Sequence, residues 1–333
     1  MNPVSLVEVG SYLPEQAVGA DFYTDPDAPP DENQMFRAPA FRRHVSAEET
    51  MVSMAAEAAR PMLERMRERG EDTRVDMVLT NVSMPDRMFT GAGAEIVARL
   101  GLRPVPEWII DVHNSGCASF VYMMKIARQV IASGAARSAL LCSGQNMAGK
   151  LFARPQIRHR KHAAIPGDGC GVGFLRVGDE SPVLDVVTHH SVEYAEDMDV
   201  RGSTRKYWEA GEDEIDMNFT DEGVERIVDR GNRLVPQVTR ELCQRLDTSP
   251  ADIDLLVTNQ PNRMFLRNWH ESLGVKPERH PDTFDEYGNL FGAGIPVTLT
   301  RARDENRLRK GDLVVLSGFA HAGDFAAATA VRW

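Results

Sequence analysis

Short apolar runs alternate along the chain with longer stretches in which apolar residues recur every three or four positions. The runs are rich in Val, Leu and Ile and are bounded by Gly, Pro or Asn, which is typical of buried strands in a largely parallel sheet. The longer stretches predict amphipathic helices at residues 47–69, 118–133, 221–246 and 297–306. This alternation indicates an α/β fold.

The chain also repeats itself in order. Three runs of the first half return in the second half, residues 75–81 as 253–259, 110–111 as 284–285, and 139–144 as 314–318. The separation is 178 residues for the first pair (259 minus 81) and 174 for the second (285 minus 111). We interpret each run as a strand; the alternative is a chance match between short Val- and Leu-rich segments. The preserved order predicts two related halves, residues 1–178 and 179–333.

Composition and charge narrow the class of protein. The 333 residues carry a formal net charge of -11, which argues against general binding of nucleic acid, because its phosphates are bound by Lys and Arg. No apolar run approaches the roughly 20 residues that a membrane-spanning helix needs. The four cysteines show no C-x-x-C spacing and no secretory signal is recognisable, so we expect a cytoplasmic protein.

Cys117 lies where a predicted strand turns into a predicted helix, in the stretch Ile-Ile-Asp-Val-His-Asn-Ser-Gly-Cys at 109–117. The free N–H groups at a helix start favour a thiolate and stabilise an oxyanion, so this position predicts a nucleophile with a lowered pKa. The alternative is a cysteine that packs as a small apolar side chain. We prefer that alternative for Cys142, Cys170 and Cys243.

Seven motifs occur in the order found in β-ketoacyl-acyl-carrier-protein synthase III, and together they span nearly the whole chain. They lie at residues 10–15, 43–45, 114–122, 167–173, 259–262, 287–296 and 318–319. The chain resembles this family, which implies a thiolase fold of duplicated, five-layered αβαβα architecture and a homodimer. The resemblance also implies that the substrate is an acyl thioester of coenzyme A or of an acyl carrier protein, with no permanently bound cofactor.

The resemblance identifies the catalytic positions and shows where this chain departs from the family. The family uses Cys, His and Asn; Cys117 and Asn289 match, whereas Asn259 occupies the histidine position. An amide still donates a hydrogen bond, but it cannot take a proton near neutral pH. Losing one donor to a developing oxyanion costs roughly two to three orders of magnitude in rate.

A second departure lies near the C-terminus, where the family has a run of glycines. Here the chain reads Gly-Phe-Ala-His-Ala-Gly-Asp at 318–324. His321 beside Asp324 is a candidate base for deprotonating an incoming alcohol or amine, or Cys117 itself. The alternative is a loop histidine with its ring in solvent.

The resemblance also suggests binding residues. Arg37 and Arg160 match positions that contact the nucleotide and pantetheine of coenzyme A, and Asn262 belongs to the matching Asn-Gln-Pro-Asn motif. The adenine-stacking Trp of the family is replaced by Asn33. Phe89, Met84 and Met88 are candidates for lining the acyl pocket, with packing in the core as the alternative.

Three further polar features lie elsewhere in the chain. His113, four residues before Cys117, could approach the site, but we expect it to pack in the turn. The pair His189-His190 lacks a third ligand, so we predict no metal site. The basic stretch 154–162 is either a binding site for phosphates or an acidic carrier protein, or a solvated loop.

These residues lead to three hypotheses. The first is an acyltransferase that loads an acyl group onto Cys117 and passes it to an oxygen, nitrogen or carbon nucleophile, in specialised metabolism. The second is a decarboxylating ketosynthase, in which Asn259 and Asn289 hold the enolate and His321 substitutes functionally for the lost histidine. The third is a non-catalytic partner subunit of a ketosynthase, against which the retained Cys117 argues.

Overall fold

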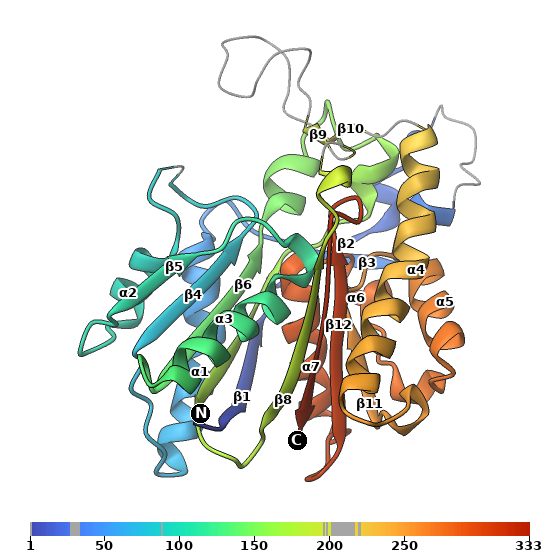
Figure 1. Ribbon diagram of the computed structural model, residues 1–333. Helices are drawn as coiled ribbons and strands as arrows, with labels where there is room; N and C mark the ends of the chain where they lie inside the picture. The colour runs from blue at the N-terminus through green and yellow to red at the C-terminus, as the bar shows by residue number, and fades with distance from the viewer. Residues whose placement is uncertain are drawn as a thin grey trace.

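Two β-sheets lie side by side in the computed structural model, with helices between them and on their outer faces (Figure 1). The structure describes residues 2–26, 34–87, 89–195, 197, 199–200, 217–218 and 221–333. In spatial order, the first sheet contains β1 (Val4–Tyr12), β7 (Gly169–Val177), β6 (Ser138–Gln145), β4 (Met77–Val82) and β5 (Trp108–Asp111). The pairs β4–β5 and β4–β6 are parallel, whereas β1 and β7 run antiparallel to their neighbours.

The second sheet repeats this plan. It contains β11 (Leu255–Thr258), β12 (Leu313–Ala320), β13 (Phe325–Arg332) and β8 (Val183–His190), and only β11 and β12 are parallel. The expectation of largely parallel sheets is therefore wrong outside their centres. The strand expected at 284–285 is also wrong, because α6 (Phe284–Tyr287) forms there. Every strand of the first sheet ends by residue 177, and every strand of the second begins at or after residue 183.

Helices complete five layers. Clusters of buried side chains place α1 (Met51–Glu68) and α2 (Gly93–Leu100) against the first sheet, and α4 (Asp221–Arg245) and α5 (Arg263–Leu273) against the second. Between the sheets lie α3 (Ser119–Ser133) and α7 (Gly294–Asp304). The duplicated αβαβα architecture is confirmed. Two short pairs, β2 (Gln16–Gly19) with β3 (Phe41–His44) and β9 (Asp199–Val200) with β10 (Met217–Asn218), lie outside these sheets.

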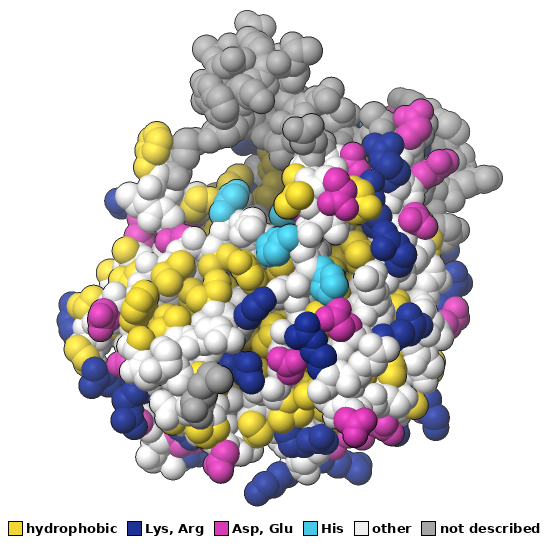
Figure 2. All heavy atoms as spheres, viewed as in Figure 1, with side chains coloured by type: hydrophobic (Ala, Val, Ile, Leu, Met, Phe, Trp, Pro, Cys, Tyr) yellow, Lys and Arg dark blue, Asp and Glu magenta, His cyan; other side chains and the backbone are white. Residues whose placement is uncertain are grey.

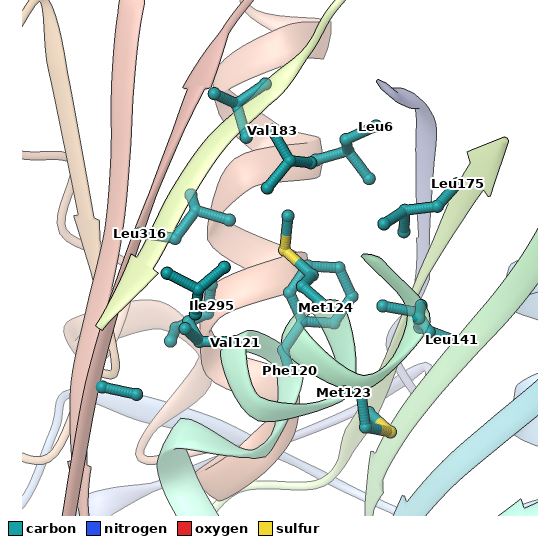
Figure 3. Packing of buried hydrophobic residues seen from close by; sticks show 14 of the residues in the cluster. Leu6, Phe120, Val121, Met123, Met124, Leu141, Leu175, Val183, Ile295 and Leu316 are labelled. Carbon is teal, nitrogen blue, oxygen red and sulfur yellow. The ribbon is translucent and has the colours of Figure 1, made fainter. Parts of the chain in front are cut away.

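The core between the sheets fixes the position of α3. Figure 3 shows Phe120, Val121 and Met124 of α3 packed between Leu141 of β6 and Leu316 of β12. Each of these side chains is almost fully buried, so the helix is held from both sides. Cys117 lies two residues before α3, so the packed helix holds its backbone in a fixed position.

No helix in the described residues is long and apolar enough to cross a membrane. All four cysteines are free thiols and all are buried.

Candidate active site

Cys117 lies in a tight turn between β5 and α3. A three-residue 3₁₀ helix (Gly116–Ala118) contains it, and Ser115 (φ 87°) and Gly116 (φ 35°) both adopt left-handed backbone conformations. A Cβ atom at position 116 would lie 2.9 Å from Nε2 of His321, so a side chain there would collide with the histidine ring. The close approach explains the need for glycine immediately before the cysteine.

Burial determines the ionisation of the Cys117 thiol. Desolvation raises its pKa to about 12; its own backbone N–H and the Asn259 side chain oppose the rise, and the charge of Asp324 adds to it. The expected lowering of the thiol pKa is therefore wrong, because burial outweighs the nearby helix start. The resting side chain is a protonated thiol, and it must lose its proton when it attacks.

A pocket of about 280 Å³ opens over Cys117 and is lined by both halves of the chain. Most of its wall is apolar, from Met35, Phe36, Val82, Met147, Ile165, Pro166, Ile227, Pro261, Phe265, Phe291 and Phe319. Its polar groups include the four candidates Cys117, Asn259, Asn289 and His321. The fold thus brings together side chains that are more than 200 residues apart in sequence.

The two asparagines present amide groups to this pocket. Asn259 follows β11 and is 1% exposed; its Nδ2 donates a long hydrogen bond of 3.4 Å to the carbonyl of Phe319, and its buried Oδ1 has no partner among the described residues. Asn289 accepts a hydrogen bond from the N–H of Phe291 at its Oδ1, over 3.0 Å. Both side chains line the pocket, so both are candidates to donate a hydrogen bond to a bound carbonyl.

His321 and Asp324 face each other across the turn that joins β12 to β13. Nδ1 of His321 lies 3.0 Å and 3.1 Å from the two carboxylate oxygens of Asp324. The histidine backbone is left-handed (φ 51°), and this conformation directs Nε2 toward Gly116. The side chain is 36% exposed, so it borders both the pocket and solvent. A carboxylate on Nδ1 leaves Nε2 as the atom that accepts a proton.

The three predicted binding residues lie in different settings. Asn262 caps α5: its Oδ1 accepts from the N–H of Phe265 at 2.9 Å, and its Nδ2 donates to the carbonyl of Met35 at 3.3 Å. Asn262 therefore shapes the pocket wall with both polar ends already used. Arg37 and Arg160 are exposed and lie outside the pocket lining. Asn33 lies outside the described residues.

Two of the three candidates for the acyl pocket, Phe89 and Met84, do not line it. Phe89 is 97% exposed, Met84 is half-buried away from the pocket wall, and Met88 lies outside the described residues. The expectation that His113 packs in the turn is wrong, because its side chain is exposed and forms part of the pocket wall.

The side chains of the last two residues of β8, His189 and His190, have different surroundings. His189 Nε2 lies 2.6 Å from the Glu241 carboxylate, whereas the ring of His190 packs against Phe325 and Tyr122. Within the described part of the chain, no group of three side chains is placed to hold a metal ion.

One pocket residue was overlooked although the sequence carried a signal for it. Asn81 ends the run that repeats as 253–259, and it is the counterpart of Asn259. Both asparagines line the pocket, and Nδ2 of Asn81 donates to the carbonyl of Val112 at 2.8 Å. The apolar wall residues gave no such signal, because they come from separate elements and resemble ordinary core residues.

Comparison with known proteins agrees with this geometry. The family described as 3-oxoacyl-[acyl-carrier-protein (ACP)] synthase III matches residues 110–191, and its C-terminal part matches residues 243–333. The beta-ketoacyl-[acyl-carrier-protein] synthase III of Acidiphilium cryptum is 30% identical over 320 residues, 95% of each chain. The protein named synthase III 3 of Streptomyces coelicolor is 30% identical over 344 residues, covering 98% of this chain and 96% of that one.

Solved structures lead to the same fold. The synthase III of Thermus thermophilus superposes with a TM-score of 0.83 at 25% identity, covering 99% of both chains. The priming beta-ketosynthase of the R1128 polyketide pathway gives a TM-score of 0.84 at 19% identity, covering 99% of this chain and 96% of that one, and it supports the fold alone. The thiolase fold, the ordered motifs and the place of Cys117 at the turn before α3 agree with these matches, and the chain belongs to the 3-oxoacyl-[acyl-carrier-protein] synthase III family.

Proposed function

We propose that this protein is an acyltransferase of specialised metabolism that takes an acyl group from a coenzyme A or carrier-protein thioester onto Cys117. A second, small-molecule substrate then accepts the group through oxygen, nitrogen or carbon, and oxygen or nitrogen acceptors fit the site best. The observation that carries the proposal is the His321–Asp324 pair, whose free Nε2 faces the residue before Cys117.

In the loading step the sulfur of Cys117 attacks the thioester carbonyl. A carbon–sulfur bond forms to Cys117, the bond to the donor sulfur breaks, and the cysteine proton ends on the departing thiol. The buried Asn259 and Asn289 side chains line the same pocket, and in this proposal their amide N–H groups stabilise the developing oxyanion. No permanently bound cofactor is needed for this chemistry.

In the transfer step the acceptor attacks the acyl carbon of the Cys117 thioester. Nε2 of His321 takes the acceptor proton, and the carboxylate of Asp324 stabilises the imidazolium through Nδ1. The carbon–sulfur bond breaks and the Cys117 thiolate recovers a proton from His321. Each turnover therefore returns both side chains to their starting states.

Intact-protein mass spectrometry tests the proposal directly. Wild-type protein and Cys117→Ala are incubated with a panel of acyl-coenzyme A and acyl-carrier thioesters, and an acyl-sized mass gain is expected only with cysteine present. His321→Gln is expected to keep the mass gain but to slow the loss of the acyl group to simple alcohols and amines by about 10²- to 10⁴-fold. Absence of any mass gain in the wild type would refute the covalent step and favour a non-catalytic partner subunit.

A second candidate function is decarboxylating condensation, which the names of the relatives support. Asn259 and Asn289 would then hold the enolate as carbon dioxide leaves a malonyl thioester. Release of carbon dioxide by the wild type, abolished in Cys117→Ala, would favour this function over ours. The two activities are separated by following carbon dioxide and acyl-enzyme in the same reaction.

We also propose that the protein works as a homodimer. Strand β5 lies at the edge of its sheet, and half-buried apolar side chains of β5 and α3 include Trp108, Ile110, Tyr122 and Ile126. Figure 2 shows apolar side chains gathered over this part of the surface. An unpaired edge beside an apolar patch favours association. Light scattering on the purified protein gives the oligomeric state.

A further inference from the structure

Arg230 of α4 is a buried cation that lies behind the catalytic turn. Only 7% of the residue is exposed, and its guanidinium stacks on the ring of Tyr194 at 3.5 Å and pairs with the carboxylate of Asp197. The pairing lowers the pKa of Asp197. A charge this deeply buried is costly unless its partners hold it in place, so these contacts fix the direction of the side chain.

The same guanidinium also contacts the turn that carries the proposed base. Its Nη1 donates to the carbonyl of Ala322 over 3.2 Å, at the residue immediately after His321. The aliphatic part of Arg230 packs on Gly323 (φ 100°), where an added Cβ would lie 3.0 Å from Cβ of Arg230. From the other side, the N–H of Ser191 donates to the carbonyl of Asp324 at 2.7 Å.

A turn with this backbone needs outside support. His321 and Gly323 are both left-handed, and the left-handed conformation is unfavourable for the histidine. The hydrogen bond within the turn from the N–H of Gly323 to the carbonyl of Ala320 closes the loop, but it does not fix how the loop tilts toward Cys117. The contacts of Arg230 and Ser191 fix this tilt, because they tie the turn to α4 and to the residue that follows β8.

We infer that Arg230 is a positioning residue that holds the His321–Asp324 turn at the distance from Cys117 that acyl transfer requires. The inference rests on the proposed function, since it concerns the transfer step. Arg230 is not among the residues that line the pocket. Its loss is expected to displace the base while leaving the nucleophile in place, because Cys117 is supported separately by α3.

The chain offers a matched control. Arg226 lies one helical turn earlier on α4 and contacts the same Asp197 carboxylate at 3.4 Å, but it is half-exposed and makes no hydrogen bond to the turn. Arg226→Met therefore removes a similar cation from the same partner without touching Ala322. Arg230→Lys keeps the charge and restores part of the contact.

The experiment uses the acyl-coenzyme A donor that gives the largest mass gain with the wild type. Two rates are measured by mass spectrometry for each variant: acylation of Cys117, and decay of the acyl-enzyme in water and in added propanol. A displacement of about 1 Å costs about 10²-fold in a positioned reaction. Arg230→Met is expected to slow decay by about that factor while acylation changes less than about twofold, with Arg230→Lys in between and Arg226→Met like the wild type.

Two results would overturn the inference. If the acyl-enzymes of Arg230→Met and Arg226→Met both decay at the wild-type rate, Arg230 does not position the base. If acylation and decay fall together in Arg230→Met, the residue has only a general structural role. If the wild type forms no acyl-enzyme, the proposed function itself is refuted. If the wild type forms the acyl-enzyme and the variants give either of the two results above, only the inference about Arg230 is refuted.

Discussion

The ionisation of Cys117 gives the sharpest test of the site. Its pKa of about 12 leaves roughly 10⁻⁵ of the thiol ionised at pH 7, against roughly 10⁻² at the ordinary value of 9.0. A thiolate of higher pKa is also the better nucleophile, and this offsets part of the roughly 10³-fold smaller thiolate fraction. Alkylation of Cys117 by iodoacetamide at pH 7 is therefore expected to be about 50-fold slower than alkylation of an exposed cysteine.

Restricted access to a buried thiol also slows alkylation, so the pH dependence decides the matter and not the absolute rate. The rate is expected to rise about tenfold per pH unit from pH 7 to pH 10, beyond the point where an ordinary cysteine levels off. Peptide mapping separates Cys117 from Cys142, Cys170 and Cys243. A rate that becomes constant below pH 9 would refute the argument that burial controls this thiol.

Two substitutions should shift the titration in opposite directions. Asp324→Asn removes a negative charge that raises the thiol pKa, so alkylation at pH 8 is expected to become faster. Asn259→Ala removes a hydrogen bond that lowers it, so alkylation is expected to become slower. The same direction of change in both variants would mean that general loosening of the pocket governs access, contrary to the electrostatic account.

Three further predictions concern stability and the altered triad. Burial lowers the pKa of His280 to about 3, so on acidification the unfolded state takes up the proton before the folded state does. The stability that the neutral side chain contributes is therefore present above pH 6.5 and is lost as the pH falls toward 3, at up to about 1.4 kcal/mol per pH unit. Urea unfolding at several pH values should show that His280→Gln loses less stability in acid than the wild type. The Glu8 side chain is 7% exposed and pairs with Arg69 at 2.8 Å, so Glu8→Gln should lower the free energy of unfolding by about 3 kcal/mol. Glu57 pairs with Arg60 on the surface, and Glu57→Gln should lower it by less than about 1 kcal/mol. Equal losses in the two variants would contradict the role of burial. Asn259→His is expected to raise carbon dioxide release from malonyl thioesters by about 10²-fold, and an unchanged rate would mean that position 259 does not limit decarboxylation.

The sequence predicted the parts of the fold that repeat or that follow a local pattern. The runs at 75–81 and 253–259 form β4 and β11, and the stretch at 118–133 forms α3. The prediction of a strand at 284–285 was wrong because the match to 110–111 covers only two residues. Over two residues, an apolar side chain followed by a polar one fits a β-strand and a helical turn equally well. Pattern length therefore separated the correct assignments from the wrong one.

The candidate site was predictable where a residue has a distinctive chemistry and a defined place in the turn. Cys117, Asn259, Asn289 and His321 all line the pocket. The ionisation of Cys117 was not predictable, because burial depends on α3 and on the second sheet, which no local sequence pattern reports. Arg230 was equally hidden, since a lone arginine in a helix looks like a solvent-exposed residue until its contacts with Tyr194 and the catalytic turn are known.

The groups in the pocket favour transfer over condensation on chemical grounds. Release of carbon dioxide from a malonyl thioester needs donors to the enolate and no base, whereas attack by an alcohol or amine requires a group that takes up its proton. At position 259, where the resemblance places the histidine of the family, stands an amide whose Nδ2 already donates to the carbonyl of Phe319, which makes it a weaker donor to an enolate. At position 321 a histidine held by Asp324 supplies a proton acceptor beside Gly116, the residue before Cys117. The two changes together remove a group that serves decarboxylation and add one that transfer needs, so a variant carrying both Asn259→His and His321→Gly should gain carbon dioxide release while losing transfer to propanol.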